Sequence, residues 1–170
     1  MKWIDYARPQ TVSEAVQLLT ERGDGARAMA GGTDLIVQLR VGRRQPDHVV
    51  DVKHIPDLNE VDTSGGGVTL GAAVPFHIIY NIDVIKDALP ALVDSASIIG
   101  GTQIQGRASI GGNLCNAAPS ADAIPTLIAL GATANVSGST GERSVAIEDF
   151  CTGPGQNVLG ADELLTSVSI

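Results

Sequence analysis

Two glycine pairs mark the positions where the backbone of this chain could approach a ligand closely. Gly31 and Gly32 follow a short apolar run, and Gly111 and Gly112 lie within residues 108–122. Polar side chains follow the second pair at short intervals, at Asn113, Asn116, Ser120 and Asp122. Glycine permits backbone dihedrals that side chains forbid, and a strand-to-helix junction presents free N–H groups that favour anions. The pattern predicts two loops that hold one ligand between them, with a pyrophosphate as the group that fits.

The glycine segments leave a simpler interpretation open. Neither matches G-x-G-x-x-G or G-x-x-x-x-G-K-[ST], which disfavours those two nucleotide-binding folds. A glycine pair after a strand is also what a plain turn requires. Apart from Arg107, no Lys or Arg adjoins either pair, so we expect backbone amides to hold an anion here.

Asp122 also has two interpretations. It lies nine positions after Asn113, at the start of an apolar stretch expected to be helical. It could cap that helix. It could equally accept hydrogen bonds from ribose hydroxyls, as acidic residues do in other dinucleotide sites.

Metal chemistry has little support in the sequence. The histidines are scattered, at His48, His54 and His77, and show no ligand spacing. Cys115 and Cys151 form no Cys-x-x-Cys pair, so they cannot by themselves hold zinc or an iron–sulfur cluster. We therefore expect no metal site.

Composition restricts the class of protein. A length of 170 residues suits one domain, or two small lobes around a cleft. The net charge of −8 argues against a nucleic-acid surface. The one compact basic group, Arg40, Arg43 and Arg44, is interpreted as a solvated turn after a helix. Residues 1–5 are too short and polar a segment for a signal peptide, and no apolar run would span a membrane. These features predict a cytoplasmic protein with reduced cysteines.

The order of elements predicts an α+β protein. We expect an N-terminal lobe of about residues 1–55 in β-α-β-α-β order, and a second lobe of about 60–170 that mixes hairpins with helices. Thr11 and Glu14 form a capping box, and the helix after Asp34 should bury Leu35, Ile36 and Leu39. Residues 102–107 are expected to be a polar connection. The expected strands cover residues 3–6, 26–29, 48–52, 68–72, 132–136, 143–147 and 164–170.

Residues 30–35 and 109–122 closely resemble motifs of the FAD-binding subunit of molybdenum hydroxylases. This family includes the medium subunit of aerobic carbon monoxide dehydrogenase and the flavin domain of xanthine dehydrogenase. The resemblance extends over residues 47–52, 68–72 and 150–155. It implies FAD as cofactor and the two-lobed FAD-binding fold of the vanillyl-alcohol oxidase and molybdopterin dehydrogenase flavoprotein type.

The resemblance also implies roles for individual residues. The pyrophosphate would be held by Ala28, Met29, Ala30, Gly31, Gly32, Thr33, Asp34 and Leu35, together with Ser109, Ile110, Gly111, Gly112 and Asn113. Asp122 would bind the adenosine ribose. The positions expected near the flavin or adenine are Gly100, Gly101 and Ile104, with Leu164 or Leu165 against the isoalloxazine.

The implied function is an electron-transfer component that is inactive alone. Electrons would pass from a molybdopterin large subunit through a [2Fe–2S] small subunit to FAD, in a heterotrimer or its dimer, and then to an external acceptor. Family subunits continue into a further α+β domain, so this chain is expected to be a fragment or a truncated product. Two alternatives remain. One is a self-contained flavin oxidoreductase resembling the cell-wall enolpyruvyl reductase, and the other is a scaffold without flavin.

Overall fold

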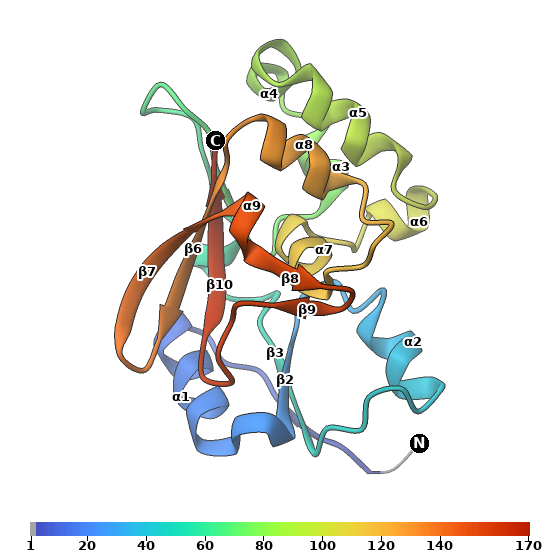
Figure 1. Ribbon diagram of the computed structural model, residues 1–170, viewed down its shortest axis with the longest axis vertical. Helices are drawn as coiled ribbons and strands as arrows, with labels where there is room; N and C mark the ends of the chain where they lie inside the picture. Colours follow the sequence, from blue (N-terminus) through green and yellow to red (C-terminus); the bar gives the residue numbers. More distant parts are fainter. Residues whose placement is uncertain (1–2) are drawn as a thin grey trace.

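The first sheet is parallel and comes from the N-terminal third of the chain. The computed structural model describes residues 3–170 (Figure 1), so Met1 and Lys2, which enter the signal-peptide argument, lie outside the described residues. The elements are β1 Asp5–Ala7, α1 Val12–Arg22, β2 Ala26–Met29, α2 Leu35–Arg40 and β3 His48–Asp51. The strands pair in the order β1-β3-β2. This is the expected β-α-β-α-β succession, and we call it the first lobe.

Local sequence explains where α1 begins and ends. The Thr11 hydroxyl accepts a hydrogen bond from the N–H of Glu14 at 3.2 Å. The Glu14 carboxylate accepts from the N–H of Gln10 at 2.7 Å, one residue before the expected capping-box partner. Gly23 ends the helix with a φ of +50°, a conformation that favours glycine.

A buried carboxylate ties the strands of the first lobe together. Asp51 is fully buried at the end of β3, where it accepts hydrogen bonds from the Tyr6 hydroxyl and the Lys53 ammonium, both at 2.6 Å. Burial by itself would raise the pKa of Asp51, but the hydrogen bonds from Lys53 and Tyr6 outweigh it and hold the pKa below its usual value. The charge is therefore kept inside because it is paired.

The second sheet is antiparallel and begins after a short 3₁₀ turn at Pro56–Asn59. Its strands follow the order β4-β5-β10-β6-β7. The C-terminal strand β10 thus lies in the middle of the sheet, between strands that are far apart in sequence. We call this sheet and the elements around it the second lobe. The strand bounds are β4 Val61–Asp62, β5 Thr69–Gly71, β6 Thr133–Gly138, β7 Gly141–Ala146 and β10 Leu164–Ser169.

Most helices of the second lobe gather at the end of the molecule opposite α1, while α7 and α9 lie nearer its middle (Figure 1). The segment 102–107, expected to be a polar connection, contains the short helix α6, and the sequence does not predict α4. A small hairpin follows α9, with β8 at Cys151–Gly153 and β9 at Gln156–Asn157. The helix bounds are α3 Phe76–Ile79, α4 Asp83–Ala88, α5 Pro90–Ile98, α6 Thr102–Gln105, α7 Ile110–Asn116, α8 Ala123–Ala129 and α9 Ile147–Phe150.

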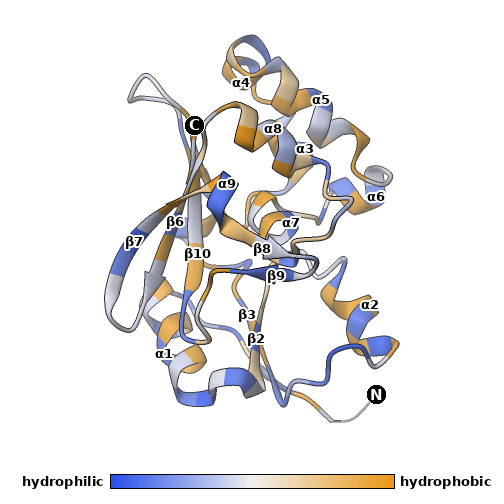
Figure 2. Cartoon of the chain, in the orientation of Figure 1, coloured by the Kyte–Doolittle hydropathy of each residue, from blue (hydrophilic) through white to orange (hydrophobic). Residues whose placement is uncertain are grey.

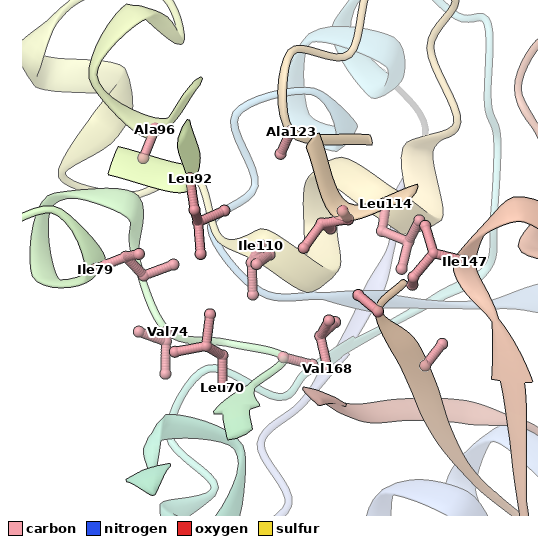
Figure 3. Packing of buried hydrophobic residues seen from close by; sticks show 14 of the residues in the cluster. Leu70, Val74, Ile79, Leu92, Ala96, Ile110, Leu114, Ala123, Ile147 and Val168 are labelled. Carbon is pink, nitrogen blue, oxygen red and sulfur yellow. The ribbon is translucent and has the colours of Figure 1, made fainter. Parts of the chain in front are cut away.

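The main core lies between these helices and the antiparallel sheet. Figure 3 shows Leu92, Ile110 and Leu114 from the helices meeting Leu70 and Val168 from the strands. A second cluster lies under α1, and there Ala73 and Leu164 of the second lobe pack with residues of the first lobe. The lobes therefore share apolar contacts, which holds the space between them in a defined shape.

The short helix α2 departs from its expected packing. Leu39 is buried, but Ile36 is 40 % exposed and Val37 is 55 % exposed. Figure 2 shows hydrophobic and hydrophilic residues along the same short helix. Leu35 is half-buried, so of the three residues expected to be buried only Leu39 is, and the expected burial of Ile36 is wrong.

Candidate functional site

A pocket of about 570 Å³ opens between the two lobes. This volume falls within the range usual for cofactor sites. Its walls include the first glycine segment, the start of α7, the β8–β9 hairpin and the start of β10. The sequence-predicted residues that line it are Ala28, Met29, Ala30, Gly31, Gly32, Thr33, Asp34, Leu35, Ile104, Ser109, Gly111, Gly112, Asn113, Leu164 and Leu165.

The first glycine segment presents a row of unused backbone donors. Among the described residues, the N–H groups of positions 31–35 donate to no acceptor of the protein. Gly32 has a φ of +76°, which turns the chain so that successive N–H groups can face one concavity. Consecutive free N–H groups before a helix bind anions. Their role in holding a particular ligand stays a prediction.

Glycine is needed at position 31 because the second lobe approaches its Cα closely, and not because its φ is positive. A Cβ at Gly31 would lie 1.9 Å from the carbonyl oxygen of Arg107. The Arg107 Nε in turn donates to the carbonyl oxygen of Gly31 at 3.1 Å. Gly31 therefore allows the two lobes to pack closely beside the pocket, and the hydrogen bond from Arg107 stabilises that contact.

The second glycine segment differs from its prediction. The sequence predicts a loop with free N–H groups, but residues 110–116 form α7, with Ser109 as N-cap. The N–H of Gly112 donates to the Ser109 hydroxyl at 3.1 Å, and that of Gly111 donates to the carbonyl of Ala72 at 3.0 Å. The N–H of Ile110 donates to the carbonyl of Val74 at 3.3 Å. These donors are already used, because α7 packs against the chain before α3.

Close packing, not unusual dihedrals, explains Gly111. Neither Gly111 nor Gly112 has a positive φ. A Cβ at Gly111 would lie 2.6 Å from both the Cβ and the carbonyl oxygen of Ala72. What α7 offers the pocket is therefore mainly side chains. The buried Ser109 hydroxyl lines the pocket, and the Asn113 Oδ1 is enclosed without a hydrogen-bond partner among residues 3–170.

An anionic dinucleotide fits these groups. The free N–H row can donate to phosphate oxygens, and Ser109 and Asn113 add polar side chains to the lining of the same pocket. The Asn113 side chain lines the pocket, although its Oδ1 is enclosed by the protein. The pocket therefore has the polar groups and the volume that a flavin dinucleotide needs.

Sequence reasoning missed three polar side chains that line the pocket, those of Arg27, Gln38 and Arg44. Arg27 and Arg44 both line it, although the stretch containing Arg44 is interpreted from sequence as a solvated turn. The Gln38 amide nitrogen donates to the Asn116 side-chain oxygen at 2.9 Å and so bridges the lobes. The spacing of Asp34 and Gln38, one helical turn apart, is the one signal that could have placed Gln38 on the same side of the helix as Asp34. Arg44 gave no such signal, because its position depends on a loop.

Some predicted residues lie outside the pocket lining. These are Gly100, Gly101, Ile110 and Asp122. Ile110 is fully buried in the core of the second lobe. Asp122 precedes α8 but makes no side-chain capping hydrogen bond, so the capping interpretation has no support in the structure. Its role toward a ribose stays a prediction.

The cysteines are free thiols beside the pocket. Burial, with a smaller contribution from the nearby Cys151, raises the pKa of Cys115 to about 12. Burial also raises the pKa of Cys151. Both are therefore poor nucleophiles at neutral pH. Within residues 3–170, no group of three His, Cys, Asp or Glu side chains could hold a metal, and no helix is long and apolar enough to cross a membrane.

Comparison with known proteins identifies the class. Residues 2–170 match the family described as the FAD-binding domain in molybdopterin dehydrogenase, and the chain belongs to this family. FAD is the cofactor of this class, in agreement with the groups that line the pocket.

Individual relatives share the domain over nearly its whole length. The chain is 35 % identical to the glyceraldehyde dehydrogenase medium chain of Sulfolobus acidocaldarius, over 97 % of this chain and 58 % of that protein. It is 37 % identical to the xanthine dehydrogenase FAD-binding subunit of Escherichia coli O157:H7, over 95 % and 56 %. The crystal structure of a Cu,Mo-CO dehydrogenase superimposes with a TM-score of 0.97 at 34 % identity, over 99 % and 59 %. The chain thus spans well under two thirds of these relatives.

Proposed function

We propose that this chain is the FAD-binding part of an electron-transfer subunit in a molybdenum hydroxylase. The observation that carries the proposal is the row of free N–H groups at residues 31–35, facing a pocket that both lobes line. Family membership supports the cofactor. We retain the division into a first lobe of about residues 1–55 and a second of about 60–170.

The chain's own residues bind and orient the cofactor. Residues 31–35 would receive the diphosphate through backbone donors, while Ser109 and Asn113 would supply side-chain hydrogen bonds from the opposite wall. Leu164 and Leu165 are buried at the start of β10 and offer an apolar surface to the flavin ring. When bound, FAD supplies the redox chemistry, accepting two electrons and passing them on. No side chain of the pocket is required to act as an acid or base.

The electrons would come from outside this chain. Medium or FAD-binding chains of a carbon monoxide dehydrogenase and a xanthine dehydrogenase are among its relatives. We therefore propose a [2Fe–2S] small subunit and a molybdopterin large subunit as partners, in a heterotrimer or its dimer. The chain alone would be inactive because it has no electron donor. We place this complex in the cytoplasm, where the free Cys115 and Cys151 would stay reduced.

Flavin binding followed by reduction tests the proposal. The 170-residue chain is titrated with FAD by calorimetry, and the complex is mixed anaerobically with a reduced [2Fe–2S] partner or with NADH. We expect one FAD per chain, bleaching of the flavin absorbance by the iron–sulfur protein, and little reduction by NADH. Rapid reduction by NADH alone would indicate a self-contained flavoenzyme. Absence of any flavin binding would indicate a scaffold and refute the proposal.

The iron–sulfur partner should also tighten FAD binding. A partner that binds only the FAD-loaded state stabilises that state by mass action. Calorimetric titrations with and without the partner measure this coupling. Equal FAD affinity in both titrations would show that the flavin site is complete within this chain.

A further inference from the structure

Arg44 is a cation without an anionic partner at the edge of the pocket. Its Nε donates to the Gln38 side-chain oxygen at 2.9 Å, and among the described residues no carboxylate lies within ion-pair distance of it. Guanidinium carries five N–H donors, so four remain unused. In a chain of net charge −8, an unpaired, half-buried arginine that lines a ligand pocket needs an explanation.

Two side-chain hydrogen bonds in series fix the position of Arg44 and connect it to the other lobe. The Gln38 amide accepts from Arg44 through its oxygen and donates to Asn116 through its nitrogen, at 2.9 Å in both cases. Both ends of the Gln38 amide are thus satisfied. Asn116 ends α7 in the second lobe, so the guanidinium is held relative to both walls of the pocket.

Arg44 lines the same pocket as the row of free N–H groups at residues 31–35. Gln38 lies one helical turn after Asp34 on α2, and residues i and i+4 share a face of a helix. Asp34 belongs to the row of free N–H groups at residues 31–35. The guanidinium and the backbone donors that would receive the diphosphate are therefore linked to the same short helix and line one pocket. Arginine suits phosphate because its planar fork can donate two parallel hydrogen bonds.

We propose that Arg44, positioned by Gln38 and Asn116, is a cofactor-binding residue whose guanidinium contacts the diphosphate of FAD. This inference rests on the proposed function, because it needs FAD in this pocket. It replaces the interpretation of Arg44 as part of a solvated turn. Its neighbour Arg43 is exposed and does not line the pocket, so the two adjacent arginines differ in role.

The test separates the diphosphate from the rest of the cofactor. Calorimetric titrations with FAD, ADP and riboflavin compare the parent chain with Arg44→Gln, Arg44→Lys and the matched control Arg43→Gln. We expect Arg44→Gln to weaken FAD and ADP binding about tenfold and to leave riboflavin binding unchanged. Arg44→Lys should retain part of the affinity because it keeps the charge. Arg43→Gln should bind all three ligands like the parent.

Salt dependence gives an independent readout. FAD affinity of the parent should fall between low and high salt, because screening weakens an exposed charge pair, and this fall should be smaller in Arg44→Gln. Thermal unfolding shows whether the variants fold. Unchanged FAD affinity in Arg44→Gln, or an equal loss for FAD, ADP and riboflavin, would overturn the inference while leaving FAD binding by the parent intact. A parent chain that binds no FAD would instead refute the proposed function.

Discussion

Gly31→Ala should damage both the fold and the cofactor site, because one methyl group would be placed between the lobes. The Cβ would lie 1.9 Å from the carbonyl oxygen of Arg107 and 2.6 Å from its carbonyl carbon. Ordinary contact begins near 3.4 Å. These neighbours are backbone atoms, which cannot rotate away as a flexible side chain can. The chain segments must therefore separate by roughly 1.5 Å.

Two physical effects set the free-energy cost of that separation. Overpacking by one methyl group typically destabilises a protein by about 1–3 kcal/mol. The hydrogen bond from the Arg107 Nε to the Gly31 carbonyl, 3.1 Å long, would break as the segments part. A hydrogen bond from a charged donor contributes about 1.5–3 kcal/mol. Because Arg107 is exposed and would regain water, the lower end applies. The expected decrease in unfolding free energy is about 3 kcal/mol.

Urea unfolding and FAD titration of the same preparations measure the two effects. Gly31→Ala should lower the unfolding free energy by that amount and weaken FAD binding at least tenfold, since the N–H row moves with the glycine. Gly65→Ala is the matched control, because a Cβ there meets nothing within 4 Å. Near-parental stability and FAD affinity in Gly31→Ala would refute the close contact between the lobes.

Three further changes address the site and the fold. Gly32→Val should abolish FAD binding with little loss of fold, because valine resists the φ of +76°. Quenching of flavin fluorescence measures FAD binding, and circular dichroism measures the fold. Tight FAD binding by the variant would contradict the prediction. Asp122→Ala should weaken FAD binding by roughly 1–3 kcal/mol and leave FMN binding unchanged in calorimetry, whereas equal losses would speak against a ribose contact. Asp51→Asn should cost about 1–2 kcal/mol of unfolding free energy at pH 7. The folded-state pKa of Asp51 is lowered, so its contribution to the free energy of unfolding is present above the unfolded-state pKa near 3.8 and is lost as the pH falls through the folded-state pKa. Denaturant titrations at pH 7 and pH 3 should therefore show the difference in unfolding free energy between variant and parent shrinking. A difference that persists in acid would contradict this.

Features set by neighbours in sequence were predictable. Thr11 accepts from Glu14 within one helical turn, and Gly23 ends that helix through its own dihedrals. The N–H groups at residues 31–35 are free because a strand ends and a short helix begins there, which the order of residues already indicates. These properties depend on local backbone geometry, so the sequence alone is sufficient to find them.

Features that depend on distant segments were not predictable. Whether the N–H groups before Gly112 are free is decided by Ala72 and Val74, which lie far back in the chain and accept two of them. Both glycine pairs look alike in sequence, and Gly31 and Gly111 both pack closely against distant segments, yet the N–H groups of the first pair are free and those of the second are used. Sequence shows where glycine occurs, but not which atoms approach it.

The sequence by itself determined the family, the cofactor and the first row of free backbone donors, because these rest on residue types within short stretches. Only the tertiary structure decided which side chains reach the pocket. Arg44 lies there because it donates a hydrogen bond to Gln38, which in turn donates one to Asn116. Gln38 and Asn116 are 78 positions apart in sequence. Long-range contacts of this kind depend on how the lobes pack against each other, and no local pattern along the chain encodes them.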